Sequence, residues 1–363
     1  MHPRVDIVRV EGPARSTVTA SRHVASALAR TLLHTEMPMR FTTLTLATLT
    51  SLAAACVGDV GGARKPARGT APTQDTGPCQ KLEQDVAIRS AADMAALPKT
   101  GCYDLYCKLT VQGQAITSLA GLHAINSVDE LDLDHTALAA IDTARPLGIF
   151  GGKLTVTGNA RLANLAQLSF ETAPTGILID GNPVLTALDP LGLADPELEE
   201  VDGDVAITGN TALTAVPLGN LTRLTGALTV SGNPALTSVD LGKLATTGPV
   251  AVHHNTALTS LGTMSALYRV TGGVMIDNNP ALADLAAFTT SLRFIDQSLT
   301  ISNNAQLADL GALKHLSLVG AITITGNQNL VNCRALEVDR CTQHPTASVI
   351  TNNKTTSCTS TCN

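Results

Sequence analysis

The chain has 363 residues, of which 44% are hydrophobic, 15% are charged and 2% are aromatic, and it contains no tryptophan. This composition excludes a long disordered polar chain and requires a core built from aliphatic side chains. The net charge of −6 provides no basic patch for a phosphate backbone, so we expect no nucleic-acid partner.

Residues 1–36 contain five arginines and show no sustained apolar period. Because Met37 and Met39 each begin a signal peptide of ordinary length, we interpret residues 1–36 as sequence translated from upstream of the true start. The alternative is an unusually long signal region, which changes nothing downstream.

Residues 37–55 have the layout of a secretory signal peptide, in which Arg40 precedes an apolar and threonine-rich run from 41 to 55. That run is shorter than the roughly 20 residues that a transmembrane helix needs. The following sequence, Ala54, Ala55 and Cys56, resembles the lipobox of bacterial lipoproteins, although Ala53 stands where that family prefers leucine. The resemblance implies lipidation of Cys56 and anchoring at a bacterial outer membrane or cell surface. An ordinary secretory signal with an incidental cysteine is the alternative.

Residues 56–78 are rich in glycine, proline, alanine and small polar residues. Such a segment has nothing to bury, so we expect a flexible tether.

A repeat follows, and it becomes visible when the chain is aligned on the asparagine of "TGN". The equivalent positions are Gln114, Thr136, Asn159, Asn182, Asn210, Asn233, Asn255, Asn279, Asn304 and Asn327. Their spacings of 22 to 28 residues predict ten coils, one of them long, over residues 108–332.

Each coil follows the pattern L-x-[VI]-x-x-N-x-x-L-x-x-[LV], as in Leu228, Val230, Asn233, Leu236 and Val239. The first two aliphatics alternate as in a short strand, and glycine and asparagine then turn the chain. A single coil buries too little to fold alone, so coils have to stack. We therefore predict a mainly β fold, a right-handed β-solenoid, in which the asparagine amides form a structural ladder from coil to coil.

The segments "IDNNPALADL" (276–285) and "ISNNAQLADL" (301–310) resemble coils of receptor L domains, which are relatives of leucine-rich repeats. The resemblance covers about residues 84–332. In ordinary leucine-rich repeats one residue separates the asparagine from the next leucine, whereas two residues do so here, as between Asn233 and Leu236. The resemblance implies a binding scaffold for polypeptide ligands and brings no catalytic residues with it.

The cysteines after Cys56 lie outside the coils, in a predicted N-terminal cap (79–107) and a cysteine-rich C-terminal cap (333–363). They are Cys79, Cys102, Cys107, Cys333, Cys341, Cys358 and Cys362. In an exported chain this favours disulfides that close the ends, with one N-terminal cysteine left over and three possible pairings of the last four. A four-cysteine zinc site in the tail is the less favoured alternative.

Ser90 with Asp93 predicts a short capping-box helix over the first coil.

The long spacing between Asn182 and Asn210 comes from an acidic insertion, which we call the contact loop. Its acidic residues are Asp195, Glu197, Glu199, Glu200, Asp202 and Asp204. They lack the ordered spacing of a calcium-binding loop, so we interpret them as a solvated insertion and as the first candidate for a partner contact.

His253 and His254 replace "TG" in one coil. Adjacent residues on a strand point to opposite faces, so we expect turn-lining side chains and no metal site.

Outward threonine and serine pairs, such as Thr155 with Thr157, resemble the ice-binding face of some solenoids, but aspartate, leucine and histidine interrupt the array.

The sequence contains no nucleophile elbow, phosphate loop or paired metal motif, so we expect neither an enzyme nor a cofactor. The predicted function is a lipid-anchored envelope or cell-surface protein whose solenoid binds a protein, a peptide or another envelope ligand. The membrane contact would be the lipid anchor alone. A purely structural envelope protein is the alternative, with ice binding or calcium-dependent adhesion as minor options.

Overall fold

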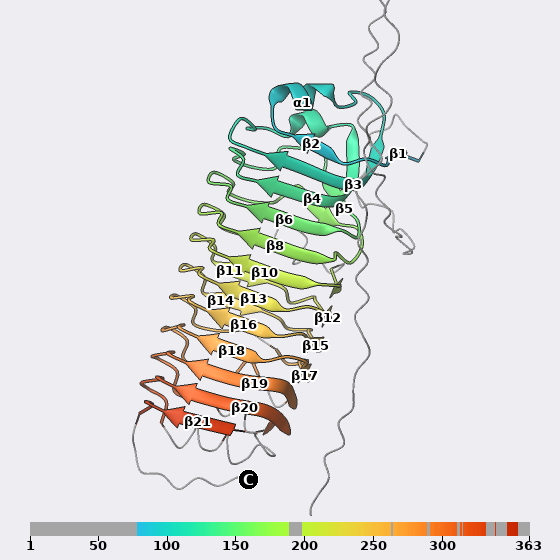
Figure 1. Cartoon of the computed structure of the whole chain (residues 1–363). Coiled ribbons are helices and arrows are strands. Elements are labelled where there is room, and N and C mark those ends of the chain that lie inside the picture. Colours follow the sequence, from blue (N-terminus) through green and yellow to red (C-terminus); the bar gives the residue numbers. More distant parts are fainter. Residues whose placement is uncertain are drawn as a thin grey trace, which may run out of the picture. The chain divides into compact units, whose positions relative to one another are not determined.

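The computed structural model describes residues 78–188, 198–262, 264–288, 291–310, 313, 315–331, 338 and 347–354. These residues form a mainly β solenoid of about ten turns, in which parallel strands stack on one another (Figure 1). The predicted fold class is therefore confirmed.

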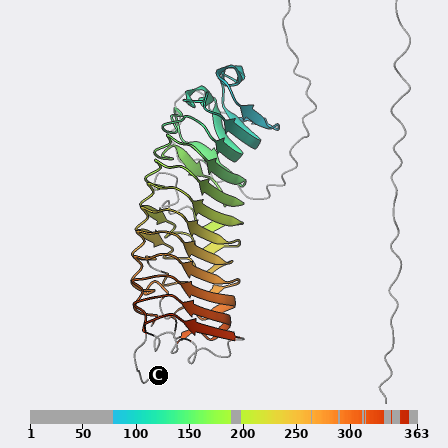
Figure 2. The same cartoon turned by 60° about the vertical axis from the view of Figure 1, so that its left-hand side comes forward.

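Most strands belong to one row, the main row, in which each coil contributes one strand. It consists of β2 (Val86–Ile88), β3 (Tyr103–Gln112), β4 (Ile125–Asp134), β6 (Lys153–Thr157), β8 (Gly176–Asp180), β10 (Asp204–Thr208), β13 (Leu228–Ser231), β16 (Val250–His253), β18 (Val274–Asp277), β19 (Phe294–Ser302), β20 (Leu318–Thr325) and β21 (Ala347–Thr351). Each strand between β2 and β21 pairs in parallel with the strand of the coil before it and the strand of the coil after it. Figure 2 shows this row along one side of the stack, with the return segments on the other.

Shorter strands form a second row where the chain approaches the main row. They are β1 (Gln80–Leu82), β5 (Leu147–Ile149), β7 (Leu168–Phe170), β9 (Glu200–Val201), β12 (Arg223–Leu224), β15 (Thr246–Thr247) and β17 (Arg269–Val270). The long strands β3, β4, β19 and β20 run through both rows. On the return side, β11 (Ala215–Pro217) pairs with β14 (Ser238–Asp240). The helical elements are α1 (Ala91–Ala96) and a 3-10 turn, η1 (Ala120–Leu122).

The core is a column of aliphatic side chains inside the coils. In the coil of β13, the side chains of Leu228, Val230, Leu236 and Val239 are fully buried. The register places Leu228 between Val205 of β10 and Val250 of β16, so that the same position of every coil packs on its equivalent. Burial of this column stabilises stacked coils but not an isolated one.

Buried asparagines connect the coils next to the main row. The Oδ1 atom of each accepts a hydrogen bond of 2.9–3.1 Å from the backbone N–H of the equivalent residue one coil earlier. The Nδ2 atom donates to a strand carbonyl of that earlier coil at 2.9–3.0 Å. The residues are Asn159, Asn182, Asn210, Asn233, Asn255, Asn279, Asn304, Asn327 and Asn353. Each side chain thus satisfies backbone groups that the turn would leave buried and unpaired.

The residue before each ladder position has a left-handed backbone, with φ between 50° and 98°. These residues are Gly113, His135, Gly158, Gly181, Gly209, Gly232, His254, Asn278, Asn303, Gly326 and Asn352. Glycine adopts this conformation without the steric cost of a Cβ atom, and asparagine and histidine tolerate it better than most residues. This turn explains why "GN" and "NN" recur in the sequence.

The stack extends beyond the predicted solenoid at both ends. β2 lies in the predicted N-terminal cap and pairs with β3, and β21 lies in the predicted C-terminal cap and pairs with β20. Asn353 adds a ladder position that the alignment did not include. At the N-terminal end the predicted short helix is present and Ser90 caps it, because the Ser90 Oγ accepts from the Asp93 N–H at 3.2 Å. The Asp93 carboxylate accepts from the Arg89 N–H at 2.8 Å, one residue before the position that a capping box uses.

Candidate binding surface

The outer face of the main row carries two columns of side chains in strict register. The first column is Thr110, Asp132, Thr155, Leu178, Ala206, Thr229, Ala251, Met275, Thr300, Thr323 and Val349. The second is Gln112, Asp134, Thr157, Asp180, Thr208, Ser231, His253, Asp277, Ser302, Thr325 and Thr351. The buried columns between them are uniformly aliphatic, whereas these outer columns vary from coil to coil.

Carboxylates in the outer columns accept hydrogen bonds from neighbouring side chains. Asp134 accepts hydrogen bonds of 2.8 Å from Gln112 Nε2 and from Thr157 Oγ1, and its Oδ1 lies 2.6 Å from the Nδ1 atom of His135. The contact with His135 is the largest of the effects that lower the pKa of Asp134 below its ordinary value. This carboxylate is therefore a fixed negative charge on the face at neutral pH.

The two adjacent histidines lie at the turn, as expected, but their rings do not point to opposite faces. His253 ends β16, and His254 follows in the left-handed turn with φ of 58°. The turn brings both rings to the outer side, with their Nδ1 atoms 2.9 Å apart. The expectation of opposite faces was wrong because strand alternation stops at the last residue of β16.

The contact loop is only partly within the described residues, because Asp195 and Glu197 lie outside them. The Arg223 Nη1 atom lies 3.2 Å from the Glu200 carboxylate and 2.9 Å from that of Asp202, and all three side chains are about half exposed. The Asp204 Oδ1 accepts from the Ala227 N–H at 2.7 Å. Glu200, Asp202 and Asp204 therefore connect their coil to the next one through ion pairs and a hydrogen bond, rather than forming an unpaired acidic cluster.

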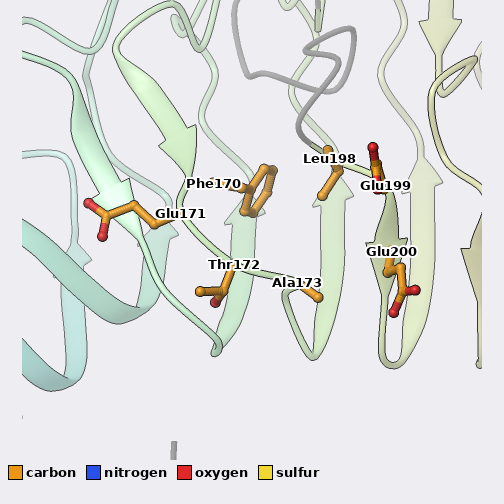
Figure 3. Close-up of a pocket in the computed structure, with 7 residues that line it drawn as sticks. All are labelled: Phe170, Glu171, Thr172, Ala173, Leu198, Glu199 and Glu200. Atoms are coloured by element: carbon orange, nitrogen blue, oxygen red, sulfur yellow. The ribbon is translucent and has the colours of Figure 1, made fainter. Parts of the chain in front are cut away.

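A hollow of about 170 Å³ lies beside the contact loop (Figure 3). It is lined by Phe170, Glu171, Thr172, Ala173, Leu198, Glu199 and Glu200. Figure 3 shows the first four residues along one segment and the last three along the next. Two of the predicted contact residues, Glu199 and Glu200, are thus placed together with the apolar side chains of Phe170 and Leu198.

An exposed aromatic group on the second row was not predicted. Tyr268 is 50% exposed, and its ring meets that of Phe294 edge to face at 5.1 Å. The Arg269 guanidinium lies 5.8 Å from the Phe294 ring and forms an ion pair with Asp296 at 2.8 Å. We call Tyr268, Arg269 and Phe294 the aromatic patch. The register of β17 and β19 brings it together from positions about one coil apart in the sequence, so no local motif reveals it.

Two of the candidate cysteines, Cys79 and Cys102, form a disulfide with Cα atoms 4.7 Å apart. It joins the start of the described chain to the residue before β3. Cys107 lies buried in β3 and is also disulfide-bonded, so it is not the leftover thiol that we expected. Cys56, Cys333, Cys341, Cys358 and Cys362 lie outside the described residues.

Among the described residues, no group of three or more histidines, cysteines or acidic residues is arranged to hold a metal ion. None of the helices in that part of the chain has the length and hydropathy that crossing a bilayer requires.

Comparison with protein-family models, with curated proteins and with solved structures finds no match to this chain. The resemblance to receptor L domains and to lipoprotein signals therefore stays a prediction from the sequence.

Proposed function

We propose that this protein is a lipid-anchored envelope or cell-surface protein of a bacterium, and that its solenoid is a non-catalytic recognition surface for protein or peptide ligands. The observation that carries this proposal is the contrast between the buried and the outer columns of the main row. Packing demands similar aliphatic side chains in every buried position. Nothing in the packing demands that the outer positions change among Asp132, Thr155, Leu178 and Met275.

A rigid backbone that presents a different side chain at every coil suits a ligand whose own chemistry varies along its length. Stacked coils give extended surfaces of this kind. A regular lattice such as ice would favour identical outer side chains, and the columns are not identical. A polypeptide is therefore the better ligand class.

The aromatic patch supports the same ligand class. Aromatic residues and arginine are enriched where proteins bind proteins, and they contribute much of the binding free energy there. With only three tyrosines, five phenylalanines and no tryptophan in the chain, the exposure of Tyr268 beside Phe294 stands out. Extended stacking platforms, which carbohydrate recognition uses, would need more aromatic residues than this chain has.

The anchor and the tether belong to the same proposal. A lipidated Cys56 would hold the protein at the membrane, and residues 56–78 would separate the solenoid from the lipid headgroups. The alternative is a structural envelope protein, in which the solenoid acts as a spacer and its outer side chains have no partner. Calcium-dependent adhesion through the contact loop is less favoured, because the carboxylates of Glu200 and Asp202 are already paired with Arg223.

Variants of the surface separate a binding module from a spacer. The full chain is used to capture envelope and extracellular proteins by cross-linking, and the affinity for each captured protein is then measured. We expect a contact-loop variant (Glu197→Ala, Glu199→Ala and Glu200→Ala) or Tyr268→Ala to lose at least about 1 kcal/mol of binding free energy, which is roughly fivefold in affinity.

The matched control is Lys243→Ala, which truncates an exposed residue on the return side. A binding module keeps its partner in this variant and loses it in the other two. A solenoid that captures the same proteins in all variants, or none in any of them, would support the structural role instead.

A further inference from the structure

The neighbouring rings of His253 and His254 form a pair of nitrogen donors on the outer face. Their Nδ1 atoms are 2.9 Å apart, and the ring planes are nearly perpendicular at 84°. His254 is exposed, and His253 is half-buried at the end of β16. The pair is accessible from solvent along the second outer column.

The two nitrogens form a hydrogen bond between the rings, and their separation of 2.9 Å is also that of two neighbouring ligands in a metal chelate. Imidazole nitrogens bind transition metals at about 2.0–2.1 Å, so two ligands at a right angle lie about 2.9 Å apart, and two at a tetrahedral angle about 3.4 Å. Right-angle positions occur in square-planar and octahedral coordination, which Cu²⁺ and Ni²⁺ adopt.

The surroundings of the pair favour a bound cation. Asp277 is the register partner of His253 on β18, and its backbone carbonyl accepts from the His254 N–H at 3.1 Å. Its carboxylate supplies a negative charge beside the pair.

Asp277 is held in place rather than free to move onto an ion. Its carboxylate accepts hydrogen bonds from Ser302 Oγ at 2.6 Å, from Asn278 Nδ2 at 2.6 Å and from Asn303 Nδ2 at 3.0 Å. We assign Asp277 as a fixed charge next to the site, with the two imidazoles as the ligands.

We propose that His253 and His254 form a surface site for a divalent transition metal ion, with Cu²⁺ bound most tightly, completed by water or by a donor from a partner. Cu²⁺ forms the most stable complexes of the divalent first-row ions with nitrogen ligands. This site would exist whether or not the solenoid recognises a polypeptide.

The coil repeat offers variants that remove the ligands and keep the fold. Other coils carry threonine and glycine at these two positions, as in Thr208 and Gly209, so His253→Thr with His254→Gly restores the common sequence. The glycine also relieves the left-handed backbone, so this variant should fold at least as well as the wild type. His135→Gly is the matched control, because His135 occupies the same turn position and pairs with Asp134 instead of a second histidine.

The test is titration of the full chain with Cu²⁺ and then Ni²⁺ at neutral pH by calorimetry, with electron paramagnetic resonance of the Cu²⁺ complex. We expect one ion with two imidazole nitrogens, tighter binding of Cu²⁺, and a loss of about 10- to 100-fold or more in affinity in the double variant, since even outer-shell partners contribute that much. His135→Gly should bind like the wild type. Equal binding by the double variant, or no nitrogen signature from two imidazoles, would show that the pair is only a hydrogen bond between rings.

Discussion

The ladder asparagines combine two roles in one side chain. Asn233 accepts from the Asn210 N–H at 2.9 Å and donates to the Ile207 carbonyl at 2.9 Å, and it is fully buried. Both backbone groups belong to the coil before that of Asn233, at the end of β10 and in the turn that follows it. The buried ladder thus connects coils through polar groups while the aliphatic column connects them through packing.

Asn233→Ala should therefore destabilise the fold strongly. It removes the partner of a buried N–H and of a buried carbonyl, and each loss costs about 1–3 kcal/mol, so we expect a loss of about 2–6 kcal/mol in the free energy of unfolding. Urea denaturation measures this loss. Thr229→Ala, on the outer face of the same coil, should cost no more than about 1 kcal/mol. Similar losses in the two variants would contradict a structural role for the ladder.

The positions of the strands could be predicted from the period of the sequence, whereas the ends of the stack could not. The alternation at Leu228 and Val230 and the turn at Asn233 predict β13 and its equivalents, because every coil has to solve the same packing problem. The strand β21 escaped the alignment because cysteines mark residues 333–363 as a cap. Yet "ITNN" at 350–353 has the same form as "ISNN" at 301–304, and Asn353 completes the ladder.

The N-terminal elements depend on a covalent connection as well as on packing. β1 and β2 pair with β3, but they have no coil before them, and the Cys79–Cys102 disulfide closes a segment of 23 residues there. Replacing both cysteines by alanine should cost about 3 kcal/mol, mostly at this end, because the last coil of a stack opens first. Hydrogen exchange should accelerate in β1, β2 and α1 and stay unchanged in β16. Unchanged protection at the N-terminal end would argue against this role.

At the scale of the whole molecule, the sequence predicts the scaffold better than the surface. The contact loop could be located because it interrupts the repeat, but its ion pairs with Arg223 come from the next coil. The aromatic patch and the histidine pair arise from register between coils and from a turn that redirects a side chain. The sequence shows that the two histidines are adjacent at a turn of the repeat, but the contact between their rings and the contacts of the aromatic patch become visible only in three dimensions.

The central claim is that a lipid anchor at Cys56 displays this solenoid on a bacterial surface. The most direct measurement is expression from Met39 in a bacterial host, with and without Cys56→Ala, followed by cell fractionation and protease treatment of intact cells. We predict that the wild-type protein is membrane-bound and cleaved by the protease, and that the variant is released from the membrane. Release of both proteins would contradict the anchor. A membrane-bound wild type that is protected from protease would contradict surface display and favour a periplasmic structural role.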